Sequence, residues 1–383
     1  MKKIFEPFSE TINVTCPTFP NKDKFQEKLD IIWKNKYLTN NGPLHEELKM
    51  ELKKYLVTNN LELFTNGHLS LEIALMALDI TGEVITTPFT FASTTQAIIN
   101  VGATPIFCEI ENKTLNIDTS KIEDLISEKT EAIMAVHVFG NPCNVEAIEK
   151  IAKKYNLKVI YDAAHAFGVK INGRDISSYG DISMFSFHAT KVFHTIEGGA
   201  LIFKDATLTE KIKSLKNFGI IESGEIPYVG TNAKMNEIQA AMGLCNLEQL
   251  SINLEKRKLI YETYLNEFSN KGELTLNYIN FKDLNMDKYN FAYFPIILKN
   301  NRIRDMLFDK CAEYNFVVRK YFYPLCSSFV DSKFAPKETP FAKKISDTIL
   351  CVPIYSDLDI CDVKKISKII LQELSVLEEK NEL

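Results

Sequence analysis

The chain has 383 residues, of which 45% are hydrophobic and 25% are charged, as in an ordinary globular protein with a sizeable core. Lys and Arg number 45 and Asp and Glu number 50, so the net charge of −5 argues against binding nucleic acid through bulk charge. No apolar run reaches the roughly 18–20 residues of a membrane span, and no signal peptide is recognisable. The eight cysteines include no CxxC pair, which predicts free thiols in a cytoplasmic protein.

From about residue 45 the chain alternates between helical and strand-like patterns. Apolar residues at helical spacing predict helices, and short β-branched runs between them predict strands. Such alternation is typical of parallel βαβ units with helices on both faces of a sheet. The expected helices are 45–56, 70–80 and 145–157, and the expected strands begin at residues 61, 83, 104, 131, 158, 182 and 200.

The pattern changes beyond about residue 235. One long helix is predicted over 235–268, followed by strands over 291–298 and 316–323 and a C-terminal helix over 362–379. We therefore expect a large α/β domain over residues 1–245, which includes the N-terminal segment. A smaller α+β domain is expected over residues 246–383.

Several of the expected strands are followed directly by polar or aromatic side chains. In parallel sheets, ligands bind at the carboxyl ends of the strands, so these positions are candidates for a binding site. The candidate segments are 65–68, 88–93, His137, 162–165 and 186–191.

Lys191 lies between the apolar run 182–187 and a glycine pair, and the next acidic residue after it is Glu197. Two interpretations are open at this point. The lysine could be an ordinary loop residue at the end of a strand. Alternatively, its amine could be partly desolvated, neutral for part of the time and able to form a Schiff base.

Asp162 ends the apolar run KVIYD and is followed by two alanines. A carboxylate in such a buried position is costly unless a cation or hydrogen-bond donors meet it. The residue could cap the N-terminus of a helix, as Asp often does, or it could contact a ligand.

Asp162 and Lys191 together suggest pyridoxal 5′-phosphate. This cofactor needs a lysine for covalent attachment and an acid that keeps its pyridine nitrogen protonated. It also needs a flat side chain to stack on its ring, for which Phe91 is the candidate. None of these residues alone is specific for pyridoxal 5′-phosphate, but their combination in this order is a much stronger indication of this cofactor.

Further candidates serve the phosphate and the phenolic oxygen of the cofactor. A turn that opens a helix at Gly67 and His68 could offer backbone N–H groups to a phosphate, and Ser186 could add a hydroxyl. His165, three residues after Asp162, could contact the phenolic oxygen.

Four motifs carry a resemblance to a known family. They are TTPFTFAST (86–94), YDAAHAFG (161–168), SFHATKVFHTIEGGA (186–200) and GTNAKMNEIQAA (230–241). These motifs are similar to those of the DegT/DnrJ/StrS sugar aminotransferases, and the likeness runs over roughly residues 30–330. It implies an α/β protein of fold type I of the pyridoxal-phosphate enzymes, with a mostly parallel sheet between helices and a smaller C-terminal α+β domain.

The resemblance also implies roles for individual residues. The aspartate, histidine, serine and lysine of the family motifs correspond to Asp162, His165, Ser186 and Lys191. Family members are homodimers with active sites at the subunit interface, and their GxNxxM asparagine contacts the partner's cofactor phosphate. In this chain that asparagine is Asn232.

Within the family, the segments 36–48 and 137–146 are similar to those of enzymes that aminate C4 of a dTDP-4-keto-6-deoxyhexose for surface-polysaccharide biosynthesis. The resemblance implies L-glutamate as the amino donor. It also implies that Lys191 removes the proton from the α-carbon of the glutamate. A close variant of these enzymes aminates C3 of a 3-keto sugar, and that alternative stays open.

Three residues are further candidates for contacts with the substrate. Arg319 could bind a carboxylate or pyrophosphate with two hydrogen bonds. Tyr321 could contact the substrate or pack in the core, from one face of the expected strand 316–323. Asn40 could line the sugar pocket or form a turn.

Other classes of function have less support. A dehydrogenase would show GxGxxG, a P-loop enzyme would show GxxxxGK, and no metal-binding cluster is recognisable. The alternative from another class is a binding or regulatory relative that kept the fold without turnover.

Overall fold

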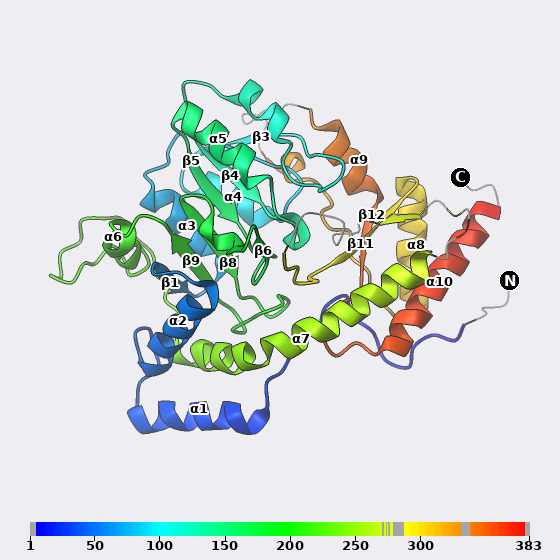
Figure 1. The fold of residues 1–383 in the computed structure, drawn as a ribbon, viewed down its shortest axis with the longest axis horizontal. Coiled ribbons are helices and arrows are strands. Elements are labelled where there is room, and N and C mark those ends of the chain that lie inside the picture. The colour runs from blue at the N-terminus through cyan, green and yellow to red at the C-terminus, as the bar shows by residue number, and fades with distance from the viewer. Residues whose placement is uncertain are drawn as a thin grey trace.

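The computed structural model describes residues 5–269, 272, 274, 276–278, 287–330 and 338–379. Figure 1 shows a central sheet wrapped by helices, with a long helix that leads from it to a second, smaller sheet.

The central sheet has seven strands in the order β1-β9-β8-β5-β4-β2-β3. Every neighbouring pair from β8 to β3 is parallel, whereas β9 is antiparallel to both β8 and β1. The prediction of a mostly parallel sheet is therefore confirmed. The strands are β1 (Leu61–Phe64), β2 (Glu83–Thr86), β3 (Thr104–Phe107), β4 (Thr130–Val136), β5 (Lys158–Asp162), β8 (Ile182–Ser186) and β9 (Gly199–Phe203).

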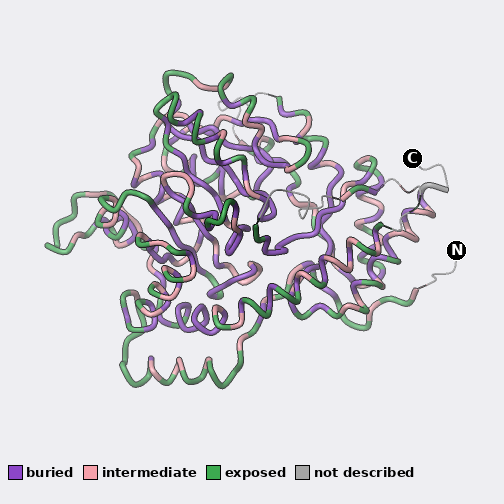
Figure 2. Tube along the Cα trace, viewed as in Figure 1, coloured by how far each residue is buried: buried purple, intermediate pink, exposed green. Residues whose placement is uncertain are grey.

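Both faces of this sheet are buried under helices (Figure 2). Successive side chains of a strand point to opposite faces, so on β4 Ala132 and Met134 join one core cluster while Ile133 and Ala135 join the other. This explains why the strands are apolar at nearly every position. The helices of this part are α1 (Lys22–Asn35), α2 (Pro43–Leu56), α3 (Gly67–Ala77), α4 (Ala92–Asn100), α5 (Val145–Tyr155) and α6 (Leu208–Leu215).

The long helix α7 (Glu237–Ser269) leads to an antiparallel sheet of the order β10-β11-β12, confirming the prediction of one long helix. Short elements complete the large part: β6 (Lys170–Ile171), β7 (Arg174–Asp175) and 3-10 turns at 119–121, 123–125, 138–140 and 176–178. The remaining elements are β10 (Leu276–Tyr278), β11 (Phe294–Leu298), α8 (Asn301–Glu313), a 3-10 turn at 326–328, α9 (Pro340–Thr348), β12 (Ile349–Val352) and α10 (Ile360–Glu379).

The prediction of a strand over 316–323 is wrong. The backbone there makes only two isolated bridges, between Phe316 and Ile12 and between Arg319 and Cys351, and then turns. Tyr321 and Tyr323 consequently do not share one face of a strand. Tyr321 lies at a cavity described below, while the ring of Tyr323 lies 4.6 Å from the guanidinium carbon of Arg304.

The division into a large and a small domain stays a proposal, and the contacts suggest where to place it. A boundary at residue 245 falls inside the continuous helix α7. The N-terminal segment, which the sequence assigns to the large domain, bonds instead to the C-terminal part through Phe8, Ile12 and Val14. We therefore propose that residues 8–14 and the second half of α7 belong with the smaller sheet.

Candidate active site

A cavity of about 360 Å³ opens at the carboxyl ends of the central strands. This size is within the usual range for a small-molecule site. Segments that follow β1, β2, β5 and β8 all reach it, as the strand-end rule predicts. Its lining includes Asn66, Gly67, His68, Thr90, Phe91, Ser93, Asp162, His165, Ser186, His188, Lys191, Glu197, Tyr293, Tyr321 and Phe322.

Asp162 lies at the floor of the cavity with 5% of its surface exposed. One carboxylate oxygen accepts a hydrogen bond from the Thr94 hydroxyl at 2.7 Å, and the other accepts one from the Ala164 N–H at 3.1 Å. Burial raises the pKa of Asp162, while these hydrogen bonds and Lys191 oppose that shift. No helix begins at Asp162 in the described chain, so the helix-cap interpretation does not hold.

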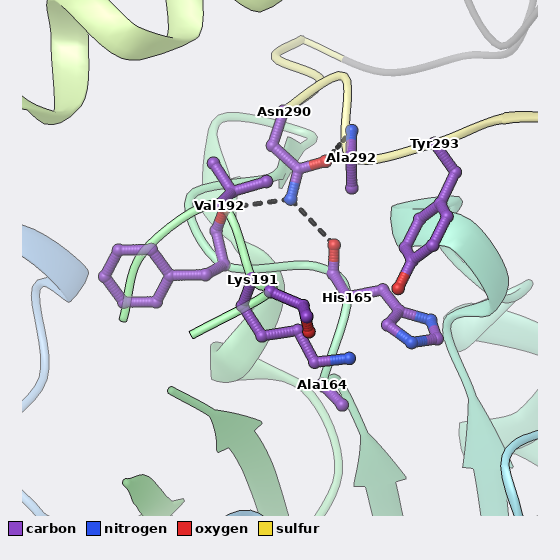
Figure 3. A pocket seen from close by; sticks show the side chains of 9 residues that line it. Ala164, His165, Lys191, Val192, Asn290, Ala292 and Tyr293 are labelled. Atoms are coloured by element: carbon purple, nitrogen blue, oxygen red, sulfur yellow. Dashed lines mark hydrogen bonds between the residues drawn. The ribbon is translucent and has the colours of Figure 1, made fainter. Parts of the chain in front are cut away.

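Lys191 lies in the turn after β8, where its N–H donates to the His188 carbonyl at 2.8 Å. Figure 3 shows its side chain running inward, with the amine close to Ala164 and His165. Among the described residues the amine has no hydrogen bond or salt bridge. Burial lowers the pKa of Lys191 to about 8, although Asp162 acts in the opposite direction. A fraction of the amine is therefore neutral near pH 7, as a nucleophile requires.

His165 forms one wall of the cavity and is buried. Its ring stacks on that of Phe322, with 5.9 Å between the ring centroids, and lies edge-to-face with the ring of Tyr293 at a centroid distance of 4.9 Å. Figure 3 shows Tyr293 beside His165. Burial, and to a lesser degree Lys191, lowers the pKa of His165 well below its usual value, so the ring is neutral. Its Nδ1 atom has no partner among the described residues.

The turn before α3 forms a cradle of backbone N–H groups. Asn66 caps the helix by accepting from Leu69 N–H at 2.9 Å, and α3 then begins at Gly67. A β-carbon at Gly67 would lie 3.0 Å from the β-carbon of Ser186, so only glycine fits this approach without displacement. First-turn N–H groups of a helix have no partner within it and favour an anion.

Phe91 is the residue immediately before α4, and 60% of its surface is exposed. Its ring lines the cavity and also an adjoining one of about 380 Å³. An exposed aromatic face next to Asp162 and Lys191 is available for a flat ring to stack on.

Three predicted residues lie elsewhere. Arg319 lines the adjoining cavity, which Tyr321 and Phe322 share with the first. Asn40 lines a separate polar cavity of about 640 Å³ between α2 and α6. Asn232 is exposed, and its backbone pairs with Asn217.

Several residues of the site escaped the sequence-based prediction. The Thr94 hydroxyl donates to Asp162 and lies 2.9 Å from the Thr90 hydroxyl. Its place at the end of the motif TTPFTFAST was the available signal. Asn290 anchors the backbone of His165 and Phe167, at 2.7 and 3.1 Å from the two carbonyls (Figure 3). Tyr293 comes from the same distant segment, for which the sequence offers no local signal.

The residues present fit pyridoxal 5′-phosphate. A buried carboxylate that retains free lone pairs, an amine without a partner, an exposed aromatic face and a glycine cradle all meet in one cavity. This arrangement on a mostly parallel sheet defines an aminotransferase of fold type I.

The chain belongs to the DegT/DnrJ/EryC1/StrS aminotransferase family, whose model matches residues 21–371. It is 42% identical to the dTDP-4-amino-4,6-dideoxy-D-glucose transaminase of Escherichia coli, over 95% of this chain and 99% of the relative. The enzyme of the same name from Shigella dysenteriae is 41% identical, over 91% of this chain and 95% of the relative. The protein is therefore a pyridoxal-phosphate-dependent transaminase.

Solved structures agree with this assignment. DesI in the presence of its TDP-sugar product superposes with a TM-score of 0.93 at 28% identity, over 98% of this chain and 96% of that one. A putative sugar aminotransferase of Streptococcus pneumoniae in its PLP form shares the fold, with a TM-score of 0.87 at 22% identity and coverage of 96% and 99%. None of the described helices of this chain is long and apolar enough to cross a membrane.

Proposed function

We propose that this enzyme transfers the amino group of L-glutamate to C4 of a dTDP-4-keto-6-deoxyhexose, forming dTDP-4-amino-4,6-dideoxyglucose for surface-polysaccharide biosynthesis. The observation that carries the proposal is the convergence of Lys191 and Asp162 in one cavity, in a chain 42% identical to a transaminase of that sugar.

The residues that would hold the cofactor surround this cavity. The N–H groups of Gly67 and His68, together with the Ser186 hydroxyl, would hold its phosphate, and Phe91 would cover one face of its ring. Asp162 would accept a hydrogen bond from the protonated ring nitrogen, a pairing that offsets the cost of burying the carboxylate. When bound, the cofactor supplies an electron-withdrawing ring that stabilises negative charge on the carbon being deprotonated.

Lys191 has two tasks in this proposal, attachment of the cofactor and proton transfer. With a pKa near 8, its amine can take the proton from the α-carbon of the amino donor and later return a proton to the sugar carbon that receives the amine. Neutral His165 can hydrogen-bond the phenolic oxygen through a ring nitrogen. The rings of Tyr293 and Phe322 form an apolar wall beside His165 that would limit the access of water.

The adjoining cavity is the proposed place for the remainder of the sugar nucleotide. It shares the lining residues Thr90, Phe91, Tyr321 and Phe322 with the cofactor cavity, so the two spaces adjoin along these side chains. Arg319 lines it and would bind the pyrophosphate. Asn40 lies in a different cavity of this chain, so we propose that it contacts substrate only across a dimer.

We also propose a cytoplasmic homodimer with shared active sites. Trp33 on α1 and Ile226 and Val229 in the segment before Asn232 are 68%, 66% and 87% exposed, as interface side chains are in an isolated subunit. The exposed side chain of Asn232 is then available for the cofactor phosphate of the partner. Equilibrium sedimentation would test the dimer, with Val229→Asp as the disrupting variant.

The first experiment is an absorption spectrum of the purified protein before and after borohydride, for wild type and Lys191→Ala. A visible band that borohydride abolishes, with a mass adduct on Lys191, is expected only in the wild type. A protein that stays colourless with added cofactor would overturn the proposal and favour a binding protein without turnover. Incubation with glutamate and dTDP-4-keto-6-deoxyglucose, followed by NMR of the product, then decides between amination at C4 and at C3.

A further inference from the structure

A chain of three side chains joins the N-termini of α3 and α4 at the rim of the cofactor cavity. The Nε2 atom of His68 lies 3.1 Å from a carboxylate oxygen of Glu72, one turn further along α3. The Nδ1 atom of His68 lies 2.9 Å from the hydroxyl oxygen of Ser93 on α4. His68 and Ser93 line the cavity, whereas Glu72 does not.

The hydrogen bonds of this chain depend on the protonation of His68. Glu72 only accepts hydrogen bonds and lies nearer to Nε2 than the Asn100 amide nitrogen does, at 3.1 Å against 3.4 Å, so we assign a hydrogen to Nε2 in either state. When His68 is neutral, Nδ1 accepts the Ser93 hydrogen, and Ser93 offers the cavity only lone pairs. When His68 is protonated, Nδ1–H donates to the Ser93 oxygen, and the Ser93 hydrogen is free to point into the cavity.

We propose that His68 is a positioning residue that, when protonated, makes Ser93 a hydrogen-bond donor to the cofactor phosphate. This inference rests on the proposed function, because it assigns the anion at this rim to the cofactor. The N–H groups at the start of α3 already favour an anion there, and the charge on His68 adds to them. A neutral His68 would instead turn oxygen lone pairs towards the phosphate.

The surroundings of His68 favour its protonated form. The hydrogen bond with Glu72 raises the pKa of His68 despite its partial burial, and the same contact lowers the pKa of Glu72. The amide of Asn100 donates to the same Glu72 oxygen at 2.7 Å and fixes the carboxylate in place. The other charged or titratable groups around the cavity are Asp162, His165, His188, Lys191, Glu197, Tyr293 and Tyr321.

The test compares two probes that differ only in the phosphate. Dissociation constants of pyridoxamine 5′-phosphate and of pyridoxamine are measured for the apoprotein by calorimetry between pH 5.5 and 8.5. We define the ratio as the dissociation constant of pyridoxamine divided by that of pyridoxamine 5′-phosphate. It reports the phosphate contribution, because the groups that face the shared ring act on both probes. In the wild type we expect the ratio to fall about tenfold as His68 deprotonates, the loss of about one charge-assisted hydrogen bond.

Two variants separate the proposal from a merely structural role of His68. In Glu72→Gln, which leaves the cavity lining intact, the fall should shift to lower pH. In His68→Gln the ratio should be low throughout, with only the pH dependence of the phosphate itself, whose second pKa is about 6. Glu46→Gln is the matched control, because Glu46 lies 3.1 Å from His45 in a similar pair outside this cavity, and its profile should equal that of the wild type.

Two contrary outcomes are distinguishable. Identical pH profiles for wild type, Glu72→Gln and His68→Gln would overturn this inference and leave the proposed function intact. Failure of the wild type to bind pyridoxamine 5′-phosphate would overturn both.

Discussion

Thr94 donates its hydroxyl hydrogen to the buried carboxylate of Asp162 across 2.7 Å. Since that hydrogen is used, the hydroxyl of Thr90, 2.9 Å away, must donate to Thr94 in turn. Two hydroxyls, that of Thr90 in the loop after β2 and that of Thr94 on α4, thus orient the acid that we propose for the cofactor site, and they come from the segment that also presents Phe91.

Replacing Thr94 with valine tests this arrangement. The variant leaves one oxygen of Asp162 without a donor, so we expect a loss of about 1–3 kcal/mol in the unfolding free energy of the apoprotein at pH 7. Thr86→Val is the matched control, because the buried Thr86 hydroxyl has no partner among the described residues. Urea titrations that show equal stability for the two variants would contradict the role of Thr94.

The loss of stability in Thr94→Val should depend on pH. Burial places the pKa of Asp162 in the folded protein above its value in the unfolded chain, so folding is favoured at low pH, and that advantage is lost as the pH rises through the folded-state pKa. Without Thr94 the pKa rises further and the ionised form is held less well. The deficit of Thr94→Val relative to wild type should therefore be larger at pH 7 than at pH 4.

The charged amine of Lys191 should lower the unfolding free energy of the apoprotein below pH 8. Its pKa of about 8 in the folded state lies below the ordinary lysine value, so the folded protein holds the charged amine at a cost. That cost is complete below pH 8 and disappears as the pH rises towards the value of the unfolded lysine. Lys191→Met should accordingly raise the unfolding free energy by about 1–3 kcal/mol at pH 7, and the gain should shrink between pH 8 and 10.

The measurement is denaturant unfolding of the apoprotein at several pH values, with Lys54→Met as the control. Lys54 is exposed at the end of α2, so its replacement should bring no comparable gain. A Lys191→Met protein that is less stable than the wild type at pH 7 would show that the amine is paired rather than desolvated.

Most of the fold follows from local pattern. Each strand from β1 to β9 in the central sheet occupies a segment where composition predicts it, and the helices α2, α3, α5, α7 and α10 occupy segments where period predicts them. The helices α1, α4, α6, α8 and α9 are not among the predicted ones. That the candidate residues at the strand ends line one cavity was predictable for a related reason, because the carboxyl ends of parallel strands share one edge of a sheet. Asp162 and Lys191, 29 positions apart in the sequence, meet at that edge.

The rest of the site depends on contacts that no local pattern encodes. Asn290 and Tyr293 reach His165 from more than 120 residues away, from the segment that leads into β11. The segment 316–323 alternates like a strand, yet its backbone turns, and Tyr321 and Phe322 line the cavity. Phe322 stacks on Phe139 and His165, and the backbone turns to bring it there.

Glu62 on β1 is the centre of a buried cluster of charged side chains outside the active site, and this cluster allows a further prediction. Glu62 is 2% exposed and pairs with Lys216 at 2.7 Å and Lys49 at 2.5 Å. Burial alone would raise the pKa of Glu62, but the two lysines outweigh it and lower the pKa to about 2. Glu62→Gln leaves Lys216 buried without its counter-charge, so we expect a loss of about 3–5 kcal/mol at pH 7.

This loss should vanish in acid and should be reversible by a second substitution. Because the folded-state pKa of Glu62 lies below the unfolded value, its contribution is present above the unfolded pKa and is lost as the pH falls towards 2. Glu62→Gln/Lys216→Met removes the orphaned charge and should recover most of the stability at pH 7. A double variant as unstable as the single one would show that packing, not charge, sets the cost.

Substitution of Arg319 should affect the two half-reactions of the proposed enzyme differently. It lines the adjoining cavity but not the cofactor cavity, so Arg319→Gln should leave the glutamate-driven spectral change of the cofactor unaltered. The KM for the sugar nucleotide should rise about tenfold or more, because one bidentate contact to the pyrophosphate is lost. Arg302→Gln, at an exposed position on α8, is the control. If both half-reactions slow equally in Arg319→Gln, the arginine supports the fold of the cofactor site, and the pyrophosphate must bind elsewhere.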